Sequence, residues 1–286
     1  MCSNLELSAE VVSMLQKQND FLFEQIQKLR KESVKLHQLI QVHQWGHKLF
    51  AKDNETLEYL TGCPSYAVFA SMTQSLTADC ATHRRLSPAN QLFLTLMKVK
   101  LYLPHAYLKA LFRGINVEET LNIWLPLLEE TLSQLLVWPS PRIRTDFIVS
   151  FFNLQFTLQV AVVFTTKGSI CYVTEALPAG RLSLFEDQEF LGQINHGDRV
   201  LVVQTGFIHK ATKQMNVIKF HLTGKKSKDV AAFNLAEKAI TNTLTRLGTF
   251  AIFSQGVDEF RHMNALVKIS AALVNLYQQN EDSDSL

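Results

Sequence analysis

The chain has 286 residues, 47% of them apolar, which is enough for one large core or two small ones. Lysine and arginine number 28 against 26 acids, so the strong basic excess typical of a dedicated nucleic-acid binder is absent. The four cysteines, Cys2, Cys63, Cys80 and Cys171, lie far apart without CxxC spacing, which argues against a disulfide framework or a zinc site. No apolar run resembles a signal-peptide core or a membrane span. We therefore expect a nuclear or cytosolic protein that does not contact membranes.

The first 50 residues predict one long helix, because they contain no proline and no glycine before Gly46. Apolar residues recur in it with a heptad period, leucines at one seam position and mostly branched residues three places earlier. The seam consists of Val12, Leu15, Asn19, Leu22, Ile26, Leu29, Leu36 and Ile40. A single asparagine among branched residues favours a parallel two-stranded coiled coil, because its amide finds a partner only when two copies face each other in register. The alternative is one amphipathic helix packed on its own domain, which Phe21 and Phe23 outside the seam would favour.

Two helical regions are expected after this helix. Residues 51–85 predict a polar, loop-rich connection with one helix over 65–76. Residues 86–141 predict a helical bundle with helix-turn-helix packing. Its apolar-periodic segments cover residues 90–103, 105–112 and 117–137.

Beyond Pro141 the apolar period changes from that of a helix to two, which predicts strands. These strands cover residues 147–152, 155–164, 169–174 and 199–205. Residues 165–168 have the composition of a hairpin turn, and helices are expected again over 230–246 and 257–277. The expected fold class is therefore a mixture of α-helices and β-strands, with an α/β domain over 142–286.

Motifs for nucleotide or metal chemistry are incomplete. Gly224-Lys225-Lys226-Ser227 resembles the end of a phosphate-binding loop, but Lys219 stands where the motif requires its first glycine. His43 and His47 lie one helical turn apart without a third ligand. We therefore expect no cofactor, no bound metal and no small-molecule substrate.

A family resemblance rests on the helical bundle. Leu86-Ser87-Pro88, Leu92 to Met97 and Leu101 to Pro104, followed by the segment from Trp124 to Trp138-Pro139-Ser140, resemble the helix-turn-helix region of Harbinger-like and THAP-type DDE-superfamily transposases. Leu60 to Tyr66 with Phe69 is similar to the segment that precedes that region. Gly168 to Val173, Gly197-Asp198, Gly206-Phe207 and Ala236 to Ile240 follow the order of the family's nuclease domain. The resemblance covers residues 58 to 278 and implies a trimmed, RNase H-like α/β domain.

The resemblance also implies which catalytic carboxylates are missing. The family cleaves phosphodiesters with two metal ions held by two aspartates and one glutamate. Here the first strand, Phe147 to Phe152, has no acid, and Gln204 occupies the second aspartate position, so only Glu237 matches. One carboxylate cannot hold a pair of divalent cations, so the chain is expected to have no catalytic residue and not to be an enzyme. The alternative is a degenerate nuclease in which Asp146, Glu175 or Asp187 reaches Glu237.

DNA binding is the remaining family activity to consider. The family's third helix would enter the major groove by its first turn, which here contains Glu118 and Glu119, and these repel phosphates. The candidate phosphate contacts are Lys98, Lys100, Arg113, Lys225, Lys226 and Lys228. We expect a transposase-derived scaffold that pairs with itself and binds other proteins in the nucleus. The alternatives are a nuclear DNA-binding regulator and a scaffold that acts in the cytosol.

Overall fold

The computed structural model describes residues 9–43, 45–77, 86–113, 115–139, 146–155, 158–178, 184, 187–194, 198–203, 240–254 and 262–284. Its contacts divide the chain into a first unit, Met1–Trp45, and a second unit, Gly46–Leu286. The described part of the first unit is dominated by the helix α1 (Ala9–His43), 35 residues long. The helical bundle expected over 86–141 and the sheet expected over 142–286 both lie in the second unit.

The second unit begins with helices. They are η1 (His47–Phe50), α2 (Asn54–Thr61), α3 (Tyr66–Thr77), α4 (Pro88–Leu101), α5 (His105–Leu111) and α6 (Val117–Ser133). The last three agree with the expected segments to within a few residues because their starts are marked in the sequence. The Ser87 side chain accepts a hydrogen bond from the Asn90 N–H, and the Asn116 side chain does the same for Glu119. These caps satisfy donors that the first turn of a helix leaves free.

The segment 51–85 is less loop-like than expected, since it contains α2 as well as the expected helix α3. Asp53 caps α2 by accepting from the Thr56 N–H, and Gly62 ends it in the left-handed conformation, at φ 76°. A Cβ at Gly62 would lie 2.8 Å from the Phe250 ring. Leu57 and Phe69 are buried. These helices are therefore part of the core of the second unit.

A buried hydrogen-bond chain joins α4 to α6. The indole N–H of Trp124 donates to Gln91 Oε1 at 2.9 Å, and Gln91 Nε2 donates to the Leu86 carbonyl at 2.9 Å. Trp124 is fully buried. Because these polar groups satisfy one another, a tryptophan and a glutamine are tolerated in an otherwise apolar core.

The strands form one mixed sheet. They are β1 (Asp146–Gln155), β2 (Leu158–Thr165), β3 (Ile170–Val173), β4 (Leu177–Pro178) and β5 (Arg199–Val203), in the order β3-β2-β1-β5, with β4 also paired to β2. β1 and β2 are antiparallel, as are β2 and β3, whereas β1 and β5 are parallel. The expected turn joins β2 to β3, with the Gly168 N–H donating to the Thr165 carbonyl.

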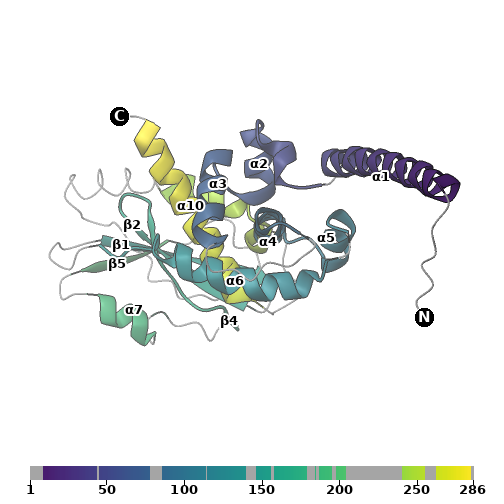
Figure 1. Cartoon of the computed structure of the whole chain (residues 1–286). Helices are drawn as coiled ribbons and strands as arrows, with labels where there is room; N and C mark the ends of the chain where they lie inside the picture. The colour runs from purple at the N-terminus through teal and green to yellow at the C-terminus, as the bar shows by residue number, and fades with distance from the viewer. Residues whose placement is uncertain are drawn as a thin grey trace, which may run out of the picture. The chain divides into compact units, whose positions relative to one another are not determined.

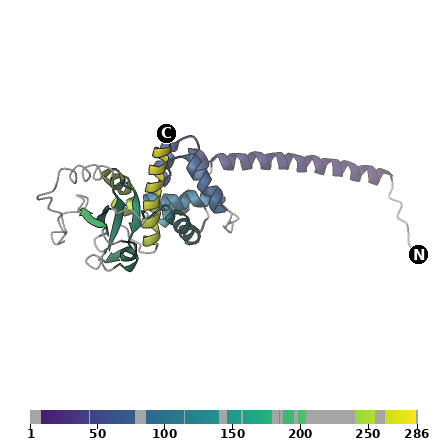
Figure 2. The same ribbon diagram turned by 90° about the vertical axis from the view of Figure 1, so that its left-hand side faces the viewer.

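Helices near the C-terminus cover the sheet. Residues 240–248 are helical and are followed by α9 (Ala251–Ser254) and α10 (Met263–Asp284). The expectation that the last helix starts at residue 257 is wrong, because His262 is left-handed, at φ 67°, and α10 starts after it. In Figure 2, α10 stands between the sheet and the helices α2 to α6, and it contacts β3, α4 and α6.

The two faces of the sheet have separate apolar layers. On one face a cluster that includes Phe147 and Val163 packs with Trp138 and with Phe190 of α7 (Gln188–Gln193). On the other face Phe152 packs edge-on against Phe253 of α9, with ring centroids 5.1 Å apart. Near-continuous burial of β2 is the result, as expected for a strand covered on both sides.

α10 also seals the outer edge of β3. Asn275, which is buried, accepts from the Ile170 N–H at 2.8 Å and donates through Nδ2 to the Ile170 carbonyl at 2.7 Å and the Leu135 carbonyl at 2.9 Å. Thr243 donates to the Gly168 carbonyl in the adjoining turn. The hairpin is thereby fixed to the helices by side-chain hydrogen bonds.

The described chain thus combines helices with a small sheet, as the mixed fold class requires. Among the helices described, none has the length and apolar character that a membrane span requires.

Candidate functional site

Most of the large apolar side chains that are exposed in the described residues lie on α1. Figure 1 draws it as one unbroken helix, and every side chain described in it, over residues 11–35, is exposed. The described apolar seam residues keep between 42% and 61% of their surface exposed, and they are Val12, Leu15, Leu22, Ile26 and Leu29. Asn19 is exposed between them. The side chains of Leu36 and Ile40 lie outside the described residues.

If α1 packed on its own domain, Phe21 and Phe23 would be expected to contribute to that packing. Both are exposed, to 60% and 62%. Both aromatic side chains of α1 are therefore exposed, as the described seam residues are.

Lys98, a candidate phosphate contact, is buried at the end of α4. Its Nζ donates to the Leu103 carbonyl at 3.1 Å and lies 3.9 Å from the centre of the Tyr102 ring. Tyr102 is left-handed, at φ 50°, which ends the helix and turns the carbonyl of Leu103 toward the ammonium group. Lys98 thus stabilises the end of α4, and this placement argues against a phosphate contact.

Lys100 is buried as well, and its partners come from a distant part of the sequence. Its Nζ donates to Thr249 Oγ1 and lies 4.1 Å from the centre of the Phe250 ring. Burial lowers the pKa of Lys100 from 10.5 to about 8, and the charge of Glu58 opposes that shift. The side chain joins α4 to the segment before α9, so its burial there also argues against a phosphate contact.

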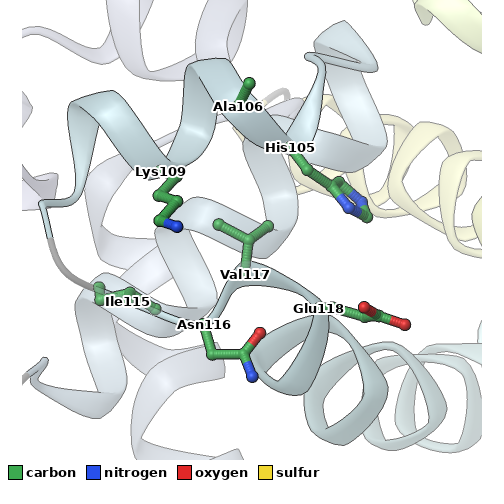
Figure 3. Close-up of a pocket in the computed structure, with 7 residues that line it drawn as sticks. All are labelled: His105, Ala106, Lys109, Ile115, Asn116, Val117 and Glu118. Atoms are coloured by element: carbon green, nitrogen blue, oxygen red, sulfur yellow. The ribbon is translucent and has the colours of Figure 1, made fainter.

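Arg113, the third candidate of this group, is exposed directly after α5. A hollow of about 560 Å³ lies between α5 and α6, and it is lined by His105, Ala106, Lys109, Ile115, Asn116, Val117 and Glu118. In Figure 3 the Lys109 side chain reaches toward Val117, and His105 and Glu118 point to the same side. Sequence reasoning did not find Lys109 or His105, since only the packing of the two helices brings them to the start of α6.

The charges at this hollow are mixed. Lys109 is exposed near the first turn of α6, but so are Glu118 and Glu119 in that turn. Carboxylates there suit the positive end of the helix dipole and repel a phosphate backbone. The arrangement therefore favours the interpretation that this helix pair has a structural role.

The expected remnants of a nuclease site are largely outside the described residues, among them Gln204, Glu237 and the run Lys225, Lys226 and Lys228. Asp146 begins β1 beside Arg199 of β5. Glu175 is exposed after β3. Within the described ranges, no three His, Cys, Asp or Glu side chains are grouped so that they could hold a metal ion.

Asp187 has a structural task. Its carboxylate caps α7 by accepting from the N–H groups of Glu189 and Phe190, and it accepts from the Tyr172 hydroxyl at 2.8 Å. Burial, with the charge and hydrogen bond of Asp187, raises the pKa of Tyr172. The tyrosine is therefore a fixed donor that ties α7 to β3.

His47 and two cysteines are also held in the core. The ring nitrogen Nδ1 of His47 lies 3.0 Å from the Tyr66 hydroxyl, and the backbone N–H of His47 donates to Asn90 Oδ1 at 3.1 Å. Burial lowers the pKa of the His47 imidazole. Burial raises the pKa of the Cys63 and Cys171 thiols to about 12, which leaves them protonated at neutral pH. None of the three is arranged as a nucleophile or a metal ligand.

Comparisons with models of protein families, with curated proteins and with solved structures found no match for this chain. Its own residues must therefore carry the functional argument, and the exposed seam of α1 is the strongest candidate they offer.

Proposed function

We propose that the chain is a non-enzymatic scaffold, derived from a Harbinger-like or THAP-type transposase, that pairs with a second copy through α1 and presents its second unit to other proteins. The observation that carries this proposal is the row of exposed apolar seam residues along a 35-residue helix. A helix in water gains most of its stability from packing an apolar face against something else. Over residues 11–35 every side chain of that face is exposed among the described residues.

A second copy of α1 fits the seam better than an unrelated helix. In a parallel pair, Asn19 meets Asn19 of the other copy, and each amide finds a donor and an acceptor. The flanking residues cause no repulsion, because Gln18 would lie beside Phe23 of the other helix and Gln25 beside Arg30. In an antiparallel pair a seam asparagine would face a leucine position instead. The parallel homodimer is therefore the arrangement we propose.

The energy available is large enough for a stable pair. Fully burying a leucine or isoleucine side chain contributes about 1.5–3 kcal/mol, and these residues are about half exposed. Five such residues on each of two helices therefore contribute on the order of 10 kcal/mol before the entropic cost of association. This sum is of the same order as the roughly 8 kcal/mol that corresponds to a micromolar dissociation constant.

The positions of several candidate residues favour a scaffold over a DNA-binding regulator and over a nuclease. Two observations argue against the DNA-binding alternative. Lys98 and Lys100 are buried, and Glu118 and Glu119 place negative charge at the start of α6. The nuclease alternative requires Asp146, Glu175 or Asp187 to reach Glu237, which lies outside the described residues, and Asp187 already caps α7. A sheet in which a hairpin precedes a parallel strand is compatible with the RNase H-like ancestry we propose. Action in the nucleus stays a prediction.

The decisive experiment measures the mass of the purified full-length chain by light scattering at micromolar concentration. We expect two copies for the wild type and one copy for Leu22→Glu, because a carboxylate at the centre of the seam must be buried to keep the pair. Gln27→Glu is the matched control, since residue 27 is exposed on α1 but outside the seam, and it should remain dimeric. A wild-type monomer would overturn the proposal.

A further inference from the structure

A second row of residues on α1 lies beside the seam. Met14, Phe21, Lys28 and Lys35 each precede a seam leucine and recur every seven residues, so they form one line along the helix. We call this line the outer stripe. Met14 and Phe21 are each 60% exposed, and both lysines are exposed.

The outer stripe is not used when α1 pairs. The residue before a seam leucine is turned by about 100° from it around the helix, so it points outward from a two-stranded coiled coil. Covering the seam with a second copy therefore leaves Met14 and Phe21 in water. A dimer would carry two such stripes, one on each helix.

The first half of the outer stripe is apolar and uncharged. Gln18 and Gln25 lie on one side of Phe21, about one turn before and after it, and Lys17 and Glu24, whose opposite charges offset each other, lie on its other side. Anchors seven residues apart are the spacing at which one helix docks on another. Methionine adapts its shape to a partner, and an exposed phenylalanine offers a large contact area.

The second half of the outer stripe is basic. From Lys28 to Lys35 the helix contains four cations and one acid, the cations being Lys28, Arg30, Lys31 and Lys35 and the acid Glu32. Pairing doubles this charge locally. A partner that covers the apolar half and continues along the helix must therefore bring acidic residues to the basic half.

We propose that the outer stripe binds an amphipathic helix of a partner protein, apolar at one end of its contact face and acidic at the other. The inference rests on the proposed function, because α1 must be paired for the stripe to be the apolar surface that remains. It assigns the chemistry of the partner that the scaffold recruits through this helix.

The test uses the full-length chain and two dye-labelled synthetic peptides of about three heptads each. Each peptide is an amphipathic helix whose contact face has leucines in its first half. In the second half, the contact face has glutamates in one peptide and lysines in the other. Fluorescence anisotropy should show that the glutamate peptide binds at least about tenfold more tightly than the lysine peptide. Added salt should reduce this difference.

Variants separate the stripe from the seam. Phe21→Glu should weaken binding of the glutamate peptide about tenfold or more while the mass stays that of a dimer. The double variant Lys28→Glu, Lys35→Glu should reverse the preference between the two peptides. Gln27→Glu, which is outside both the seam and the stripe and is turned by about 100° from the stripe around the helix, should leave the order of preference and the mass unchanged.

Two outcomes would overturn the inference and leave the proposed function standing. The first is a wild-type dimer that binds neither peptide or binds both equally well. The second is a wild-type assembly of four copies that Phe21→Glu reduces to two, since other copies of the chain would then occupy the stripe. A monomeric wild type would instead overturn the pairing through α1.

Discussion

The two units of this chain place their apolar side chains in opposite ways. In α1, leucines and isoleucines recur with a strict period and remain about half exposed. In the second unit, side chains of the same kind are buried against one another, among them Leu57, Phe93, Trp124 and Val163. The first pattern leaves its described apolar side chains in contact with water, whereas the second buries them within the chain. The comparison therefore predicts which substitutions change stability and which change association.

The largest change in stability is expected for Trp124→Ala. Removing the ring leaves a cavity between α4 and α6 and takes from Gln91 its indole donor, so the free energy of unfolding should fall by about 3–5 kcal/mol. Urea unfolding followed by circular dichroism measures the loss. Tyr107→Ala, at an exposed position of α5, is the control and should cost less than about 0.5 kcal/mol. Equal losses in both variants would contradict the placement of the core.

Lys100→Met should change stability in the opposite direction. The pKa of Lys100 is lowered to about 8 in the folded chain, so the unfolded chain holds the proton more tightly. Wild-type stability should rise as pH increases from about 8 toward 10.5, by at most about 3 kcal/mol. At pH 7 the methionine variant should be more stable by an amount up to that value, less the lost contacts with Thr249 and Phe250. A variant with the wild-type pH dependence would exclude Lys100 as the cause.

Asn275→Ala tests how α10 holds the sheet. The substitution removes three hydrogen bonds and leaves the buried N–H and C=O of Ile170 without the amide, which should cost about 2–3 kcal/mol. Lys268→Ala, also on α10, breaks a half-exposed ion pair with Glu129 and should cost no more than about 1 kcal/mol. If thermal unfolding of the two variants coincides, the edge contact contributes little.

Asn19→Ile tests the association that we propose for α1. It replaces a seam amide by an apolar side chain, so association should strengthen by about 1–2 kcal/mol. The gain should be accompanied by species larger than two copies, because the residue that fixes register and number is lost. Sedimentation measures both effects. An unchanged distribution would show that Asn19 does not lie in an interface.

The sequence predicted the parts of the fold in which local signals and packing agree. The helix α6 was expected from its apolar period, and in the structure the side chain of Asn116 caps its start. The strands β1 to β3 were expected from a period of two. The helix α2 was missed because Gly62 and Pro64 indicated loops, although Asp53 before Glu55 was an available signal for a helix start.

The candidate phosphate contacts show where sequence reasoning reaches its limit. Lysines are usually exposed, so Lys98 and Lys100 were expected at the surface. Lys98 is buried by a local turn at Tyr102, whereas Lys100 depends on Thr249, which is 149 residues away. The spacing of residues in the sequence does not indicate a contact between positions so far apart. The seam of α1 could be predicted because it depends only on the spacing within one helix.

A strand at the edge of a sheet offers free N–H and C=O groups to any extended chain that approaches it. At Ile170 both groups are already bound to Asn275, whose amide presents the same donor and acceptor as a peptide group. At Ile170, α10 therefore takes the place that a further strand would occupy. If two copies pair as we propose, such protection gains importance, because pairing raises the local concentration of every exposed edge. It would confine self-recognition to the helix and keep the sheets from fusing.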